Sequence, residues 1–142
     1  MASKVFNEGK ENFAQEDILT ITVKALLLMT NTTADTENDG ISATTDFTTL
    51  DEHDGSGYAQ QTLASKTITK DDTNDRAVFD AADVTFTSLG AGTRDVAGVL
   101  LVWDDGGTLR PISWHEYTSP RVADGTDFVV QWRSDTGIIL VQ

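Results

Sequence analysis

The chain has 142 residues, of which 39% are hydrophobic and 23% are charged. These values are ordinary for one folded domain with a real hydrophobic core, and they argue against a chain that is disordered throughout. The formal net charge is −13, so nucleic-acid phosphates and anionic membranes should repel the protein, and neither is expected as a partner. The absence of cysteine excludes disulfides and thiolate metal sites.

The first segment, residues 1–16, is polar and carries charges of both signs, unlike a signal peptide. Its isolated apolar side chains are Val5, Phe6 and Phe13. We expect an extended N-terminal arm. One interpretation is a frayed terminus. The other is an arm that docks on a neighbouring subunit, with Val5, Phe6 and Phe13 as the interface residues.

Residues 17–30 have the first clear strand pattern. Leu19, Ile21 and Val23 alternate with threonine and lysine at period two. Branching at Cβ restricts χ1 and favours the extended conformation. The alternation then gives way to the apolar residues 26–29, which indicate burial on both faces of a sheet. The longest apolar run, residues 25–29, is far too short to cross a bilayer.

Residues 31–57 differ in composition from the rest of the chain. They hold seven acidic side chains, from Asp35 to Asp54, and no lysine or arginine. We expect a long acidic surface loop with one short strand or helical turn around Phe47. Long loops in compact domains are usually functional or mobile, so this loop is a candidate contact surface.

Part of this loop resembles the calcium-binding loop of an EF-hand. Asp35, Glu37 and Asp39 alternate before a glycine, and Asp46 stands where the twelfth loop ligand would be. The glutamate in the third position and the aspartate in the last depart from that pattern, and no flanking helices are evident. A solvated acidic loop without metal is therefore the simpler interpretation. A second, equally weak oxygen cluster consists of Asp71, Asp72 and Asp75.

Short strands separated by turn residues follow as far as the C-terminus. We expect them at residues 58–64, 66–69, 76–80, 83–88, 96–103, 109–117, 127–133 and 137–141. Gly106 and Gly107 mark the clearest hairpin turn, because glycine tolerates positive φ. We expect the last two strands to form a closing hairpin. The pattern predicts one all-β domain over residues 17–142, an antiparallel β-sandwich of jelly-roll-like or immunoglobulin-like type.

The sequence has no motif typical of an enzyme. Asp135 begins an Asp-Thr-Gly triplet like that of aspartic proteases, but its surroundings indicate a hairpin turn. His53 and His115 are not at a spacing typical of a zinc site. Nucleophile elbows, phosphate loops and dinucleotide fingerprints are all missing. We therefore expect no catalytic activity and no cofactor, and a small hydrolase is the least favoured function.

Three tryptophans, Trp103, Trp114 and Trp132, fall in expected strands. Buried or interfacial tryptophans are the commoner case, and a carbohydrate-stacking platform is the alternative. The arginines of the second half suit protein contacts because of their planar, fork-like guanidinium groups. A solvated strand face is the other interpretation of those arginines.

Several stretches resemble a family of small bacteriophage virion proteins. They are residues 13–29 with ITVKALLL, Gly57-Tyr58 followed by Thr62-Leu63, KTITKDDTNDRAVFDAADVTF at 66–86, and AGVLLVWDDGGTLRPIS at 97–113. The resemblance implies a β-sandwich on the outer capsid lattice that bridges copies of the major capsid protein. It supplies no functional residues, and the acidic segment 31–57 is the least family-like part.

These observations lead to two expected functions. The first is a capsid cement or decoration protein, a homo-oligomer with a trimer favoured, present on the virion surface and in the host cytoplasm during assembly. The alternative is a tail-associated or fibre-associated virion protein that binds host-surface glycans.

Overall fold

The computed structural model describes residues 3–15 and 17–141 and is mostly β, with 41% strand and 10% helix. The helical elements are α1 (Asn7–Ala14) and the 3-10 turns η1 (Asp17–Leu19) and η2 (Thr44–Asp46). The strands are β1 (Ser3–Val5), β2 (Val23–Met29), β3 (Gln61–Thr62), β4 (Thr67–Asp71), β5 (Arg76–Asp80), β6 (Val84–Phe86), β7 (Val96–Asp105), β8 (Thr108–Arg121), β9 (Phe128–Val130) and β10 (Ile139–Val141). All strand pairs are antiparallel, which confirms the expected all-β fold.

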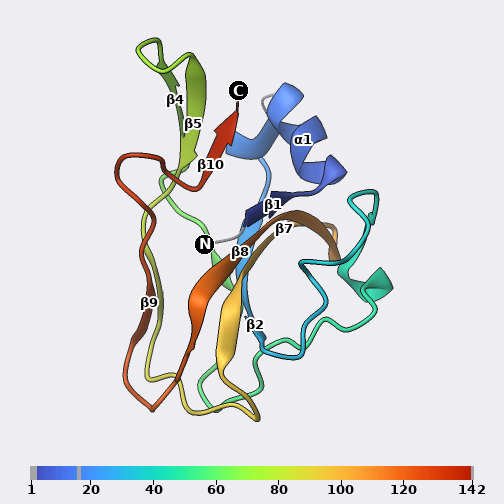
Figure 1. The fold of residues 1–142 in the computed structure, drawn as a ribbon, viewed down its shortest axis with the longest axis vertical. Helices are drawn as coiled ribbons and strands as arrows, with labels where there is room; N and C mark the ends of the chain where they lie inside the picture. The colour runs from blue at the N-terminus through green and yellow to red at the C-terminus, as the bar shows by residue number, and fades with distance from the viewer. Residues whose placement is uncertain (1–2, 16, 142) are drawn as a thin grey trace.

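A five-stranded sheet of order β1-β8-β7-β2-β3 forms the centre of the molecule (Figure 1). β7 and β8 are joined by the predicted hairpin turn, where Gly106 and Gly107 have φ of +59° and +97°. β2 pairs with β7 along its whole length. Its side chains alternate between two separate apolar clusters, so the strand is buried on both faces as its sequence predicted.

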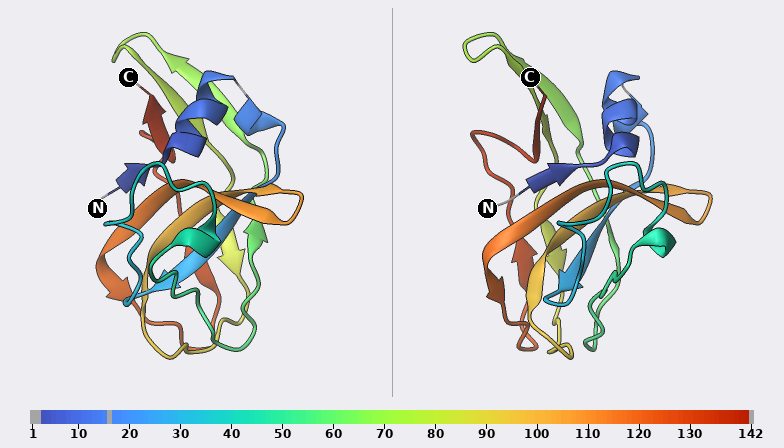
Figure 2. Two further views of the ribbon diagram at one scale, coloured as in Figure 1. Left: turned by 90° about the vertical axis from the view of Figure 1, so that its right-hand side faces the viewer. Right: turned by 45° about the vertical axis from the view of Figure 1, so that its right-hand side comes forward.

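Two smaller sheets cover one face of the central sheet. One has the order β10-β5-β4, and the other pairs β6 with β9. The apolar core on this side joins all three sheets, for example through Leu27, Phe79, Phe86 and Val99. In Figure 1, β9 lies to the left of β8, β7 and β2, and in the left view of Figure 2 the teal part of segment 31–57 lies in front of the central sheet. The finer assignment as a jelly-roll-like or immunoglobulin-like sandwich stays a prediction.

The acidic segment 31–57 covers the opposite face of the central sheet (Figure 1). Ala34 and Phe47 are buried against a cluster that includes Leu26 and Trp114. The predicted short helical turn is η2, which ends immediately before Phe47. The segment is therefore a packed cover with an acidic outer surface, and its few apolar residues hold it to the sheet.

The N-terminal segment is folded onto the domain, and the expectation of an extended arm is wrong for the described residues. Val5 pairs with Ser113 at the edge of the central sheet, and α1 follows directly. Phe6 is fully buried, and Phe13 packs edge-on against Phe79 with ring centroids 5.4 Å apart. Phe6 is thus part of the protein's own core, and Val5 and Phe13 are partly buried against it, so these side chains contact the chain's own domain.

The expected closing hairpin is also wrong. The turn itself exists, since the Gly137 amide donates to the Arg133 carbonyl at 2.7 Å. The two flanking strands then diverge: β9 pairs with β6, and β10 pairs with β5. Because the strands diverge, Val130 and Ile139 are buried in the core beside different strands. The free energy gained by burying this apolar surface outweighs the hydrogen bonds that a continued hairpin between the two strands would form.

Candidate functional site

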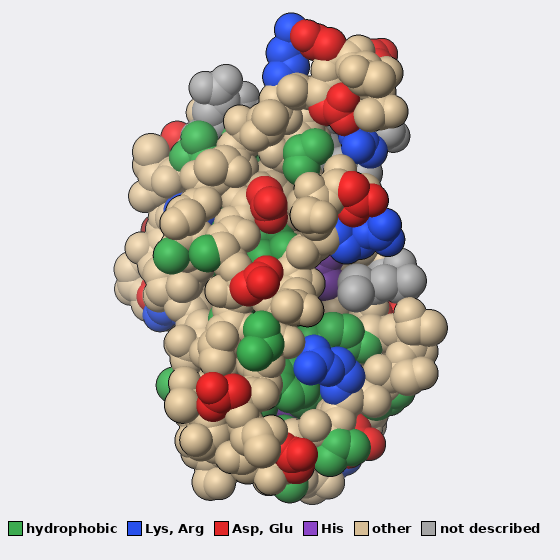
Figure 3. Space-filling model, turned by 90° about the vertical axis from the view of Figure 1, so that its left-hand side faces the viewer, with side chains coloured by type: hydrophobic (Ala, Val, Ile, Leu, Met, Phe, Trp, Pro, Cys, Tyr) green, Lys and Arg blue, Asp and Glu red, His purple; other side chains and the backbone are tan. Residues whose placement is uncertain are grey.

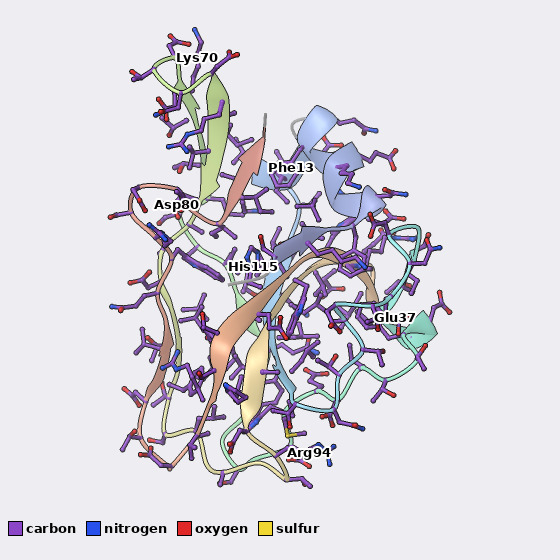
Figure 4. The ribbon with its side chains drawn as sticks, viewed as in Figure 1. Phe13, Glu37, Lys70, Asp80, Arg94 and His115 are labelled. Carbon is purple, nitrogen blue, oxygen red and sulfur yellow. The ribbon has the colours of Figure 1, made fainter. Side chains whose placement is uncertain are left out.

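The β4–β5 hairpin projects beyond the rest of the molecule (Figure 1). Among the described strands β4 pairs only with β5, so its other backbone edge is open. The side chains of residues 67–70 are exposed, and Ile68 is one of the few large apolar side chains at the surface, at 36% exposure. Lys70 lies near the tip (Figure 4). This hairpin offers an unpaired strand edge to a partner.

Two of the weak calcium candidates are used to close this hairpin. Asp71 accepts a hydrogen bond from Asn74 at 2.8 Å and one from Arg76 Nε at 2.8 Å. These bonds lower the pKa of Asp71. Asp72 instead pairs with Lys70 at 2.8 Å. The carboxylates therefore turn toward different nitrogen donors.

The EF-hand-like carboxylates are likewise not brought together. Glu37 accepts from the Thr33 hydroxyl, and burial would raise its pKa, but hydrogen bonds from Thr33 and Thr48 outweigh burial and lower it. Asp39 pairs with Lys4 at 3.2 Å. The side chains of Asp35 and Asp46 are exposed. Within residues 3–15 and 17–141, no three acidic or histidine side chains are grouped so that they could hold a metal ion.

A trough lies between the central sheet and the chain that joins β9 to β10. Its cavity volume is about 470 Å³. A smaller cavity of about 250 Å³ shares His115, Ser3 and residues 136–138 with it and extends toward Val5 and Ile139. Figure 3 shows histidine atoms in a recess of this face. The trough is lined by Ser3, Val99, His115, Tyr117, Thr118, Val130, Gln131, Trp132, Arg133, Thr136, Gly137 and Ile138.

His115, which lines the trough, is paired with Ser113 behind it on β8. The Ser113 hydroxyl lies 2.9 Å from His115 Nε2, and both side chains are buried. Burial lowers the pKa of His115 to about 4, because the imidazolium form would lose its hydration. Ser113 is 0% exposed, and no carboxylate orients the imidazole among the described residues. The geometry therefore lacks the accessible nucleophile and the orienting acid of a hydrolytic triad.

Trp132 forms one wall of the trough and is held at two points. Its backbone amide donates to Asp83 at 3.0 Å, and its indole Nε1 donates to the Ala82 carbonyl at 3.1 Å. The indole meets the His115 ring edge-on, with centroids 5.9 Å apart. Trp114, by contrast, is a core residue. Trp103 packs beneath the Arg110 guanidinium, 5.7 Å from its ring centroid. Only Trp132 of the three lines the trough.

His53 has a structural position. Its Nε2 lies 3.0 Å from the Gly90 carbonyl and must carry the hydrogen, since a carbonyl only accepts. The ring packs edge-on against Tyr58. A Cβ on Gly92 would come within 2.7 Å of the His53 ring, so the loop needs glycine there. Nδ1 has no hydrogen-bond partner among the described residues. The His53 ring therefore packs between its own loop and the loop that contains Gly90 and Gly92.

Asp135 lies in the turn between β9 and β10 and is exposed. It pairs through both oxygens with Arg133, at 3.1 and 3.0 Å. This hydrogen bonding lowers the pKa of Asp135. Its geometry is that of the turn that the sequence predicted.

Sequence reasoning missed most of the trough. Gln131 and Thr136 belong to the segment for which a closing hairpin was wrongly predicted, whereas Tyr117 lies on β8, whose pairing with β7 was predicted correctly. One local pattern could have indicated part of the trough lining. His115 and Tyr117 are two residues apart in a predicted strand, so their side chains point to the same side of the sheet.

Comparison with known proteins adds no relative. No family model matches the chain, no curated protein matches it, and no solved structure matches its fold. None of the helices in residues 3–15 and 17–141 is long and apolar enough to cross a membrane.

Proposed function

We propose that this chain is a structural protein of a bacteriophage particle, a cement or decoration protein that binds the outer surface of the major capsid protein lattice. The resemblance of its sequence to small virion proteins motivates the proposal. The observation that carries it is the projecting β4–β5 hairpin, whose outer strand is exposed along residues 67–70 and has one edge unpaired by any described strand.

The mechanism of binding follows from that edge. A strand of the capsid protein adds to β4, and main-chain hydrogen bonds supply affinity while side chains such as Ile68 supply specificity. The net charge of −13 favours a basic surface on the capsid side and keeps free copies apart before assembly. The hairpin thus replaces the N-terminal residues as the proposed contact.

Stabilisation of the head follows by mass action. A protein that binds only the assembled lattice adds the free energy of binding to the assembled state. A stable contact of this kind buries about 1,200–2,000 Å² in total, more than one hairpin covers. Three copies around a local symmetry axis would supply the remaining buried area, so the proposal keeps a homotrimer on the virion surface. Free protein would be present in the host cytoplasm during assembly.

Co-sedimentation with capsids that lack the protein tests this proposal. Ile68→Glu places a charge on the open edge and should weaken binding at least about tenfold, which corresponds to about 1.4 kcal/mol. Thr85→Glu, at the exposed position of strand β6, is the matched control and should bind as the parent does. Near-ultraviolet circular dichroism checks that both variants are folded. Equal binding by the two variants would remove the hairpin from the proposal.

One observation favours the alternative, a tail-associated or fibre-associated protein that binds host glycans. Trp132 lines a trough of about 470 Å³ together with hydroxyl and amide side chains. Immunogold labelling with an antibody to the chain separates the two functions, because labelling confined to the tail favours the alternative and labelling over the head favours decoration.

A further inference from the structure

We propose that the trough between β8 and residues 131–138 is a binding site for an uncharged saccharide unit. The inference concerns a site separate from the hairpin and does not depend on where the protein sits in a particle. It rests on the shape of the trough, on its lining and on its charge.

The size and the aromatic wall of the trough suit a ring-shaped ligand. Its volume of about 470 Å³ lies within the range of about 300–1,000 Å³ that is usual for small-molecule sites. Trp132 is anchored at both its backbone amide and its indole nitrogen, so the aromatic surface is in place before any ligand arrives. Tyr117 adds a second aromatic ring to the lining. A pyranose presents a face of C–H groups that packs on such surfaces.

The polar lining suits the hydroxyl groups of a sugar. Thr118, Gln131 and Thr136 line the trough, and their side chains make no hydrogen bond to other described residues. Hydroxyl and amide groups both donate and accept hydrogen bonds. A sugar hydroxyl does the same, so either partner can adapt to the other. Small-molecule sites typically combine an apolar wall with a few polar groups of this kind.

The charge of the trough selects an uncharged ligand. The chain carries 23 aspartates and glutamates, yet no acidic side chain is among the described residues that line the trough. Its one cationic side chain among those residues, Arg133, is already paired through two hydrogen bonds with Asp135. His115 is neutral near pH 7, since burial lowers its pKa to about 4. A cation finds no carboxylate in this described lining, and an anion finds no free positive charge.

Protein-observed NMR with glucose, galactose and N-acetylglucosamine tests the site, with the full chain isotopically labelled. We expect saturable shifts of the Trp132 indole N–H and of backbone amides in residues 115–118 and 131–138, for at least one sugar at millimolar concentration. Trp132→Ala should weaken that binding about tenfold. Thr118→Val keeps the β-branched shape, removes a hydroxyl at an exposed position, and should weaken binding a few-fold.

Trp103→Phe is the matched control, because Trp103 lies outside the trough and packs against Arg110. This variant should bind as the parent does. Absence of saturable shifts with every sugar, or unchanged binding by both Trp132→Ala and Thr118→Val, would overturn the site. Neither result bears on capsid binding through the hairpin, so failure of this inference and failure of the proposed function are told apart by the two assays.

Discussion

The imidazole Nε2 of His115 lies 2.9 Å from the Ser113 hydroxyl in a place where both side chains are buried. Burial removes the hydration that stabilises an imidazolium ion and lowers the pKa of His115 to about 4. The pair is therefore uncharged at neutral pH, and both of its residues lie on β8, with His115 also lining the trough.

The free energy of unfolding should depend on pH through His115. The ordinary pKa of a histidine side chain is 6.5, and the pKa of His115 in the folded protein is about 4. Between these values the unfolded chain binds a proton that the folded protein does not. The free energy of unfolding therefore falls as the pH decreases from 6.5 to about 4, by on the order of 3 kcal/mol. Urea unfolding across this pH range measures the loss.

His115→Gln isolates this contribution. The amide offers Ser113 a hydrogen-bond partner but does not titrate. The variant should be less stable than the parent at neutral pH, and its stability should change less between pH 6.5 and about 4. Carboxylates such as Asp51 titrate in both proteins and cancel in the comparison. Parallel pH profiles would show that His115 is not buried as described.

Phe6 should be a stability residue. It is 0% exposed and packs against Phe47 with ring centroids 5.8 Å apart. Phe6→Ala should lower the free energy of unfolding by about 3–5 kcal/mol through loss of buried surface and formation of a cavity. Val122→Ala, at a position 66% exposed, is the control and should change stability by about 0.5 kcal/mol or less. Parent-like stability of Phe6→Ala in urea would restore the free-arm interpretation.

Gly98 should not tolerate a side chain. A Cβ at this position would come within 2.3 Å of the His115 carbonyl oxygen and 2.7 Å of the Trp114 ring. Gly98→Ala should lower the free energy of unfolding by about 1–3 kcal/mol, because β7 and β8 must separate. Gly106→Asn is the contrasting variant, since its φ of +59° suits asparagine and nothing lies within 4 Å. Thermal unfolding should show a loss for Gly98→Ala only, and similar losses for both would contradict the close approach.

Calcium at millimolar concentration should not raise the melting temperature. Glu37 and Asp39 are engaged by Thr33 and Lys4, respectively, and they do not form one oxygen cage. Calorimetric titration offers a second readout, and the expected result is no saturable heat. A rise in melting temperature that Asp39→Asn abolishes would show that segment 31–57 rearranges around the ion.

The regular hairpins were predictable because their signals are local. The expected strand at 76–80 coincides with β5, and Gly106 and Gly107 mark the turn between β7 and β8. The double-sided burial of β2 was predictable from its continuous apolar run. For the β7–β8 hairpin neighbouring residues determine the pairing, and for β2 the local apolar run indicates burial but not its pairing with the distant β7.

The remaining features depend on contacts distant in the sequence. The ends of the chain pair with β8 and β5 instead of with their neighbours, and no local pattern specifies such partners. Phe6 precedes α1 in an extended conformation and packs in a different cluster from Phe13, so no single apolar stripe in the sequence marked the helix. The trough was unpredictable for the same reason, because its walls come from segments that meet only after these long-range pairings form.

Cryo-electron microscopy of virus particles released from cells that carry this gene tests the central claim most directly. The account predicts density for this fold on the outside of the head, at repeated lattice positions, with the β4–β5 hairpin directed at the major capsid protein. Particles whose heads carry no such density would contradict the account, as would density in which the hairpin faces solvent.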